Sequence, residues 1–192
     1  WKRPPVGLVA GGDIESQQPL LSPTYFVERA LEAAAEVRSA PLELLLNQPP
    51  AVIVLADVGV VPETERPALD AWLEEGGVLI RFAGPLFSQE SDDLVPVEIR
   101  GRERALGGAM SWSSAQRIAL FDNNSPFAGL LPPPDVLIDR QVLAEPTVDL
   151  TAKTWARLED GTPLVTAEKR GEGWLVLVHT TANTQWTNLP IS

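Results

Sequence analysis

The hydrophobic residues in the first half of the chain gather in three short runs. Residues 6–10, 51–56 and 78–82 are rich in Val, Leu and Ile and show little alternation of apolar with polar side chains. Strands that are buried on both faces of a parallel sheet have this pattern. We therefore expect three strands inside one covered sheet.

Helical patterns fill the gaps between these runs. Ser22-Pro23 is a typical helix start, because a hydroxyl caps the first turn and proline suits the first helical position. Apolar residues then recur at helical spacing to about Val37. A second helix is expected from Pro62 to the glycine pair at residues 76–77. Residues 42–46 fit either a short helix or a strand, and the alternation as a whole indicates β-α-β units and a parallel sheet.

The second half of the chain has a different character. Residues 85–135 are loop-rich and are interpreted as an insertion in a single domain that spans residues 1–192. Short strands are expected at residues 97–100, 118–120 and 136–142. Residues 155–158, 164–169 and 174–179, separated by glycine turns, predict an antiparallel meander. The expected fold class is α/β, with a mixed sheet that is parallel at its start and antiparallel at its end.

Charge and composition exclude several classes of function. The formal net charge of -11 disfavours binding to nucleic acid or to an anionic membrane surface, since both repel an acidic protein. The chain has no cysteine, which excludes disulfides, thiolate metal sites and cysteine catalysis. No apolar stretch approaches the about 18 residues that cross a bilayer. A chain that begins with Trp1-Lys2-Arg3 is interpreted as a fragment of a longer polypeptide.

Polar residues at the predicted strand ends are the candidates for a ligand crevice. The only histidine, His179, follows a strand that is apolar on both faces, and open α/β sheets build their ligand crevices at the carboxyl ends of such strands. By the same reasoning Asp13, Asp57, Gly84 and Asn183 are candidates to line that crevice. A hydrogen-bonded strand-end histidine and an Asx turn or cap at Asp57 are the plainer alternatives.

Other polar motifs carry weaker signals. Trp112 and Trp186 are flanked by Ser, Thr, Gln and Asn, as in protein or sugar interfaces, although both could equally cover the edges of the core. Residues 122–124 resemble part of a calcium loop but lack its glycine and closing glutamate. With one histidine and no cysteine, we expect no metal site, and we expect no cofactor.

Several stretches together resemble a known family. Residues 51–57, the helix end at residues 74–77 and residues 78–85 are similar to the core of class I glutamine amidotransferase-like domains. The closing stretch, from residues 171–174 to residues 186–190, resembles the end of such domains in bacterial inner-membrane proteins of the aerotolerance-regulator (BatA-like) type. The resemblance implies a flavodoxin-like three-layer sandwich. It also implies an extracytoplasmic (periplasmic) domain, with the cytoplasm as the alternative, whose partners are other domains of the same membrane protein or an envelope protein.

The family's catalytic residues are largely missing from this chain. His179 resembles the family's histidine in position, but Thr181 stands where the family has a glutamate. The turn at residues 83–85 offers neither thiol nor hydroxyl as the nucleophile. The resemblance therefore implies a non-catalytic interaction or regulatory domain. A degenerate hydrolase or small-molecule-binding domain that uses the crevice near His179 is the alternative, and a spacer role is a third.

Overall fold

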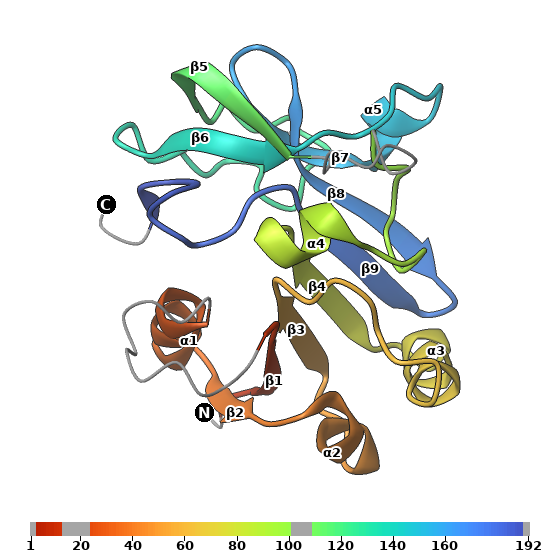
Figure 1. Cartoon of the computed structure of the whole chain (residues 1–192). Coiled ribbons are helices and arrows are strands. Elements are labelled where there is room, and N and C mark those ends of the chain that lie inside the picture. Colours follow the sequence, from red (N-terminus) through yellow and green to blue (C-terminus); the bar gives the residue numbers. More distant parts are fainter. Residues whose placement is uncertain (1–2, 13–23, 101–108, 190–192) are drawn as a thin grey trace.

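One mixed sheet of seven strands forms the centre of the molecule. The structure is a computed structural model and describes residues 3–12, 24–100 and 109–189. The strands of the sheet lie in the order β2-β1-β3-β4-β9-β8-β7, and β5 and β6 form a separate pair (Figure 1). The strands are β1 (Pro5–Ala10), β2 (Glu36–Ser39), β3 (Val52–Ala56), β4 (Val78–Phe82), β5 (Ala109–Arg117), β6 (Leu137–Val142), β7 (Thr154–Arg157), β8 (Pro163–Arg170) and β9 (Gly173–Val178).

The direction of the strands changes at β9. Strands β1 to β4 and β9 pair in parallel. Strand β8 is antiparallel to β9, and β7 is antiparallel to β8. The expected α/β fold, with a sheet that is parallel at its start and antiparallel at its end, is confirmed.

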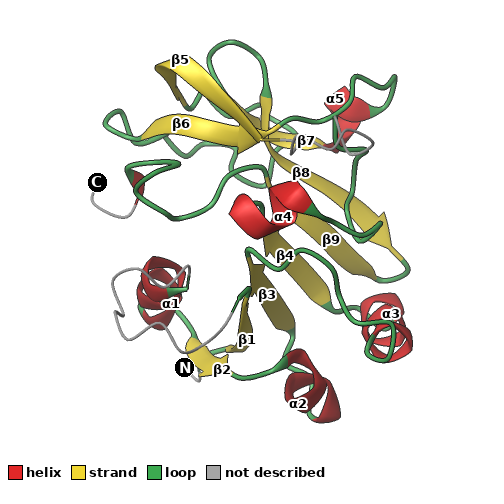
Figure 2. Ribbon diagram, viewed as in Figure 1, coloured by secondary structure: helices red, strands yellow, loops and turns green. Residues whose placement is uncertain are grey.

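Helices lie on both faces of the parallel part of the sheet (Figure 2). The helices are α1 (Tyr25–Glu32), α2 (Leu42–Asn47), α3 (Arg66–Glu74), α4 (Pro85–Gln89) and α5 (Leu150–Lys153). Successive side chains of a strand face opposite sides of its sheet. In β3, Ile53 and Leu55 pack with α2 and α3, whereas Val54 and Ala56 pack with α1. This double burial explains why β3 has no polar alternation in its sequence.

Two helix boundaries differ from the sequence-based expectation. Helix α1 ends at Glu32 rather than near Val37. Val37 instead belongs to the edge strand β2 and pairs with Val6 of β1. Four residues at an edge are too few to display a strand pattern of their own. Helix α3 begins at Arg66 rather than at Pro62, because the N–H of Glu65 donates to the carbonyl of Pro62 and closes a turn there. The ambiguous segment at residues 42–46 is helical, as α2.

In the second half of the chain, the structure contains the predicted antiparallel meander, as β7 to β9, and the strand predicted at residues 136–142, as β6. Strands were also expected at residues 97–100 and 118–120. Each of these segments instead forms one isolated β-bridge, at Ile99 and at Ile118. Strand β5 and the short helices α4 and α5 were not predicted. Strand β5 is mostly exposed and has few apolar residues, so it lacks the hydrophobic pattern by which strands are recognised.

Candidate functional site

His179 follows β9 directly and is completely buried. Its backbone N–H donates to the carbonyl of Leu164, and its own carbonyl accepts the N–H of Val142. Both nitrogens of the imidazole ring also form hydrogen bonds. Nδ1 lies 2.8 Å from the carbonyl oxygen of Val142, and Nε2 lies 2.9 Å from the hydroxyl oxygen of Thr166. The residue therefore joins the end of β9 to β8 and to β6.

These contacts fix the tautomer of the neutral imidazole. A carbonyl oxygen can only accept, so Nδ1 carries the proton and Nε2 accepts the hydroxyl hydrogen of Thr166. Burial lowers the pKa of His179 to about 4, and the hydrogen bond to Val142 opposes this in part. At neutral pH the ring is therefore uncharged, and both of its nitrogens are engaged inside the protein.

The segment after His179 builds a turn rather than an open crevice. Thr181 is buried with 1% of its surface exposed. The side chain of Asn183 accepts the N–H of Gln185 at 2.8 Å, and its carbonyl accepts the N–H of Trp186 at 2.8 Å. Trp186 is 2% exposed and packs in a core cluster. The interpretation of Trp186 as an interface residue is therefore corrected, because its ring closes the core.

Asp57 and Gly84 lie together, where Asp57 caps a helix. Asp57 follows β3 with φ of 56° and is 3% exposed. Its carboxylate accepts the N–H of Leu86 at 3.2 Å and that of Phe87 at 3.0 Å, in the first turn of α4. Burial raises the pKa of Asp57, and these hydrogen bonds lower it in part. A β-carbon on Gly84 would lie 2.5 Å from Cγ of Asp57, so this turn requires glycine.

The five expected crevice residues do not share one open site in the described structure. Asp13 lies outside the described residues. Asp57 and Gly84 meet at the start of α4, His179 is enclosed between β6 and β8, and Asn183 belongs to a turn. Their sequence positions at strand ends gave the correct edge of the sheet but not the orientation of their side chains.

A large cavity lies near the carboxyl ends of β1, β2 and β3. It has a volume of about 730 Å³ and is lined by Gly11 and Gly12 after β1, by Ser39 at the end of β2, and by residues 58–61 after β3. The chain leaves β1 toward α1 and leaves β2 toward α2, and these helices cover opposite faces of the sheet. The place where successive connections leave toward opposite faces is the topological switch point of the sheet. Ligand crevices of open α/β sheets form there. Sequence reasoning missed this position because it depends on the spatial order of the strands.

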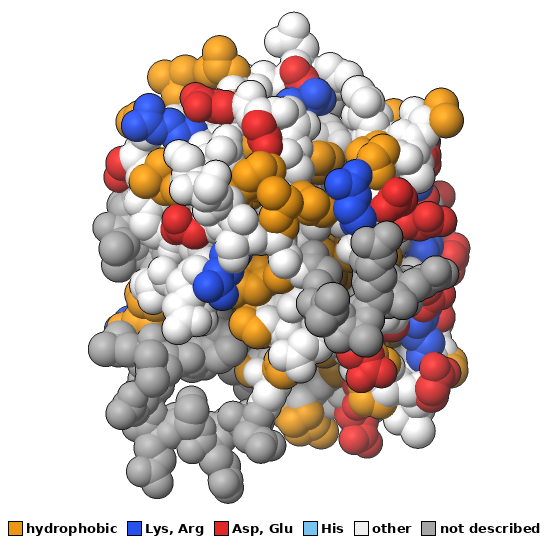
Figure 3. All heavy atoms as spheres, turned by 45° about the horizontal axis from the view of Figure 1, so that its top comes forward, with side chains coloured by type: hydrophobic (Ala, Val, Ile, Leu, Met, Phe, Trp, Pro, Cys, Tyr) orange, Lys and Arg blue, Asp and Glu red, His pale blue; other side chains and the backbone are white. Residues whose placement is uncertain are grey.

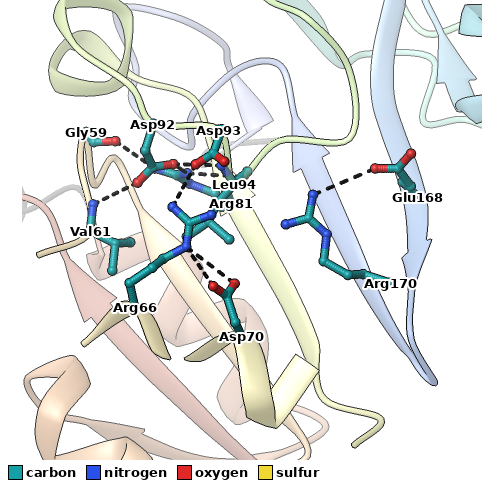
Figure 4. A network of polar contacts seen from close by, with 10 residues as sticks. All are labelled: Gly59, Val61, Arg66, Asp70, Arg81, Asp92, Asp93, Leu94, Glu168 and Arg170. Atoms are coloured by element: carbon teal, nitrogen blue, oxygen red, sulfur yellow. Dashed lines mark hydrogen bonds and ion pairs between the residues drawn. The ribbon is translucent and has the colours of Figure 1, made fainter. Parts of the chain in front are cut away.

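A buried arginine holds one wall of this cavity in place. Arg81, on β4, is 1% exposed, and its Nη2 donates to the carbonyls of Val58 at 2.8 Å and Gly59 at 2.7 Å. Its Nη1 pairs with the carboxylate of Asp92, whose other oxygen accepts the N–H of Val61 at 2.7 Å (Figure 4). The pair therefore holds Val58, Gly59 and Val61 in place beside the cavity.

Trp112 lies on β5, away from this cavity. Its ring is half-buried against the cluster that contains Val136 and Ile138. Large hydrophobic side chains that are well exposed lie in the segment after β5, at Leu120, Leu130 and Leu131. On the face at the top of Figure 1, hydrophobic side chains lie among charged and other polar ones (Figure 3). Trp112 thus contributes to the core from its edge, and its role in an interface stays a prediction.

Comparisons with known proteins identify likenesses of fold. Neither a protein-family model nor a curated protein sequence matches the chain. A cytoplasmic protein from Salmonella typhimurium LT2 is similar in structure with a TM-score of 0.69 and 11% identity, covering 97% of this chain and 91% of that chain. A second cytoplasmic protein from Salmonella typhimurium has a TM-score of 0.66 and 10% identity, covering 95% of this chain and 89% of that chain. The β-galactosidase from Rahnella sp. R3 has a TM-score of 0.60 and 16% identity, and the match covers 97% of this chain but 30% of the galactosidase.

The comparisons correct the expected location. The two Salmonella proteins that share the fold over most of their length are cytoplasmic, which overturns the extracytoplasmic location implied by the resemblance. Within the described ranges, none of the helices has the length and apolar character needed to cross a membrane. The same ranges hold no group of three or more His, Asp or Glu side chains placed to bind a metal ion.

Proposed function

We propose that this chain is a non-catalytic interaction domain, which binds another protein or another domain of a longer chain without turning over a substrate. The observation that carries the proposal is the state of His179. A general base must accept a proton from a substrate or a nucleophile within hydrogen-bond distance. Here Nε2 already accepts from Thr166, Nδ1 donates to Val142, and the ring is fully buried.

The turn after β4 gives a second, independent line of support. In acyl transfer, a nucleophile and free N–H donors must face the reacting carbonyl. The N–H groups of Leu86 and Phe87, at the start of α4, are already bonded to the carboxylate of Asp57. Residues 83–85 are Ala, Gly and Pro, which carry no nucleophilic side chain. A thioester or ester intermediate has no place to form in this turn.

The proposal includes the finer fold and the ancestry of the domain. We interpret the chain as a flavodoxin-like three-layer sandwich related to the class I glutamine amidotransferase-like domains. The strand order β2-β1-β3-β4 and the placement of α1 opposite α2 and α3 support this interpretation. The partial match to a much longer galactosidase supports a role for the fold as one unit of a larger protein.

Hydrolysis assays on the chain and on His179→Gln test the absence of catalysis. Substrates would be L-glutamine, p-nitrophenyl acetate and p-nitrophenyl β-D-galactoside, with folding of both proteins verified by circular dichroism. We expect neither protein to exceed the buffer rate with any of the three. Saturable turnover by the wild type that a folded His179→Gln variant loses would contradict the proposal.

A further inference from the structure

The cavity at the ends of β1, β2 and β3 has the dimensions of a ligand site. Sites for small molecules have volumes of about 300–1,000 Å³ and combine apolar walls with a few placed polar groups. This cavity has about 730 Å³. Its accessible apolar walls include Val9, Val58 and Val60. Neither His179 nor Asp57 lines it.

The charges around the cavity are of one sign. Among the described residues that line it, the charged side chains are Glu28 and Glu65, with no lysine or arginine. Within the described ranges neither carboxylate forms an ion pair, whereas the nearby Arg29 and Arg66 pair with carboxylates outside the cavity lining. A ligand that enters this cavity therefore meets uncompensated negative charge.

The position of Glu28 works against anionic ligands in particular. Glu28 lies in the first turn of α1, where the helix dipole would otherwise attract a phosphate or a carboxylate. Its Oε1 accepts the hydroxyl hydrogen of Ser39, at the end of β2, at 2.9 Å. This hydrogen bond holds the carboxylate beside the cavity. The negative charge of Glu28 therefore already offsets the positive end of the α1 dipole.

Glu65 adds a second carboxylate on another wall. It immediately precedes α3 and is half-buried. Burial raises the pKa of Glu65, and repulsion from Glu43 raises it further. A positive charge placed beside Glu65 would offset both effects, so its environment favours a cationic neighbour.

We propose that this cavity binds a small organic cation, an amine that carries an apolar body. The apolar body lies against Val9, Val58 and Val60, and the ammonium group donates to the carboxylates of Glu28 and Glu65. The inference rests on the proposed function in that it expects binding without turnover. The site and the chemical class of its ligand go beyond the proposed function, because the absence of catalysis specifies neither of them.

Three probes of one shape and different charge test the proposal. They are cyclohexylmethylamine, cyclohexylmethanol and cyclohexanecarboxylate, titrated into uniformly ¹⁵N-labelled protein near neutral pH. We expect the amine to shift the amide signals of Gly11, Gly12 and Gly59, which line the cavity. A charge-assisted contact predicts that the amine binds about tenfold more tightly than the alcohol, and that the carboxylate binds more weakly than either.

Conservative variants locate the charge that selects the ligand. Glu28→Gln and Glu65→Gln should each weaken amine binding several-fold and leave binding of the alcohol unchanged. Glu32→Gln, on α1 but outside the cavity lining, is the matched control and should bind the amine as the wild type does. Two variants on different elements keep the test valid if one of them fails to fold.

Several results would overturn the proposal. These are equal binding of amine and alcohol, tighter binding of the carboxylate, shifts confined to residues away from the cavity, no amine binding at its highest soluble concentration, or full affinity in both folded cavity variants. None of these results concerns turnover. The hydrolysis assay therefore tests the proposed function separately.

Discussion

Asp92→Asn is predicted to destabilise the fold strongly. The side chains of Arg81 and Asp92 are 1% and 9% exposed. Asparagine keeps an oxygen that can accept the N–H of Val61 but loses the negative charge, so the buried guanidinium loses the carboxylate with which it pairs. Removing one partner of a buried ion pair costs about 3–5 kcal/mol. For a domain of this size, that corresponds to a fall of about 6–20 °C in Tm.

The neighbouring Asp93 provides the matched control. Asp93 pairs with Arg66, but its side chain is 74% exposed, and exposed pairs contribute at most about 1 kcal/mol. Urea unfolding followed by tryptophan fluorescence would compare Asp92→Asn, Asp93→Asn and the double variant Arg81→Met/Asp92→Asn. The double variant should recover part of the loss, because both charges are gone. Equal effects of the Asp92 and Asp93 changes would refute the reasoning that Arg81 is a buried, dependent charge.

Three further changes test the contacts around His179 and Gly84. Because burial lowers the pKa of His179 from 6.5 to about 4, the unfolded chain binds a proton there before the native state does. The free energy of unfolding should therefore fall as pH drops from 6.5 toward 4, by about 2 kcal/mol at pH 5. Urea titrations at pH 7 and pH 5 should show this loss in the wild type and not in His179→Gln; equal losses would contradict it. Thr166→Val leaves Nε2 of the ring without a donor and should cost about 1–3 kcal/mol in urea unfolding at pH 7, and an unchanged midpoint would contradict the assigned tautomer. Gly84→Ala places a β-carbon against Asp57 and should cost about 1–3 kcal/mol by the same measurement, while wild-type stability would show that the turn can relax.

The parallel half of the sheet could be predicted because its signals are local. In β3 every residue is apolar and both faces are buried, so the sequence pattern and the three-dimensional environment agree. Strand β2 gave no such signal, since three of its four residues are exposed. The burial of Arg81 could not be predicted either, because a charged residue in a strand is ordinarily exposed. Its burial depends on Asp92, which a separate loop supplies.

The candidate site was predicted only in part, for a related reason. The sequence placed His179 at a strand end correctly, but its surroundings come from Val142 and Thr166, which are distant along the chain. Asp57 was correctly expected at a strand end, and the plainer interpretation of it as a cap fits the structure. The cavity was missed because it forms where β1 lies between β2 and β3, an arrangement that no single segment encodes.

The protonation state of His179 decides whether this ring is available as a general base. The chain has a single histidine, so a long-range ¹H–¹⁵N spectrum of protein labelled at histidine reports on this ring alone. We predict the neutral tautomer with the proton on Nδ1, and a pKa of about 4 because burial disfavours the charged ring. A proton on Nε2, or a pKa at or above 6.5, would show that the ring is not held as a buried, uncharged acceptor of the Thr166 hydroxyl. That result would contradict the observation on which we base the proposal of a non-catalytic domain.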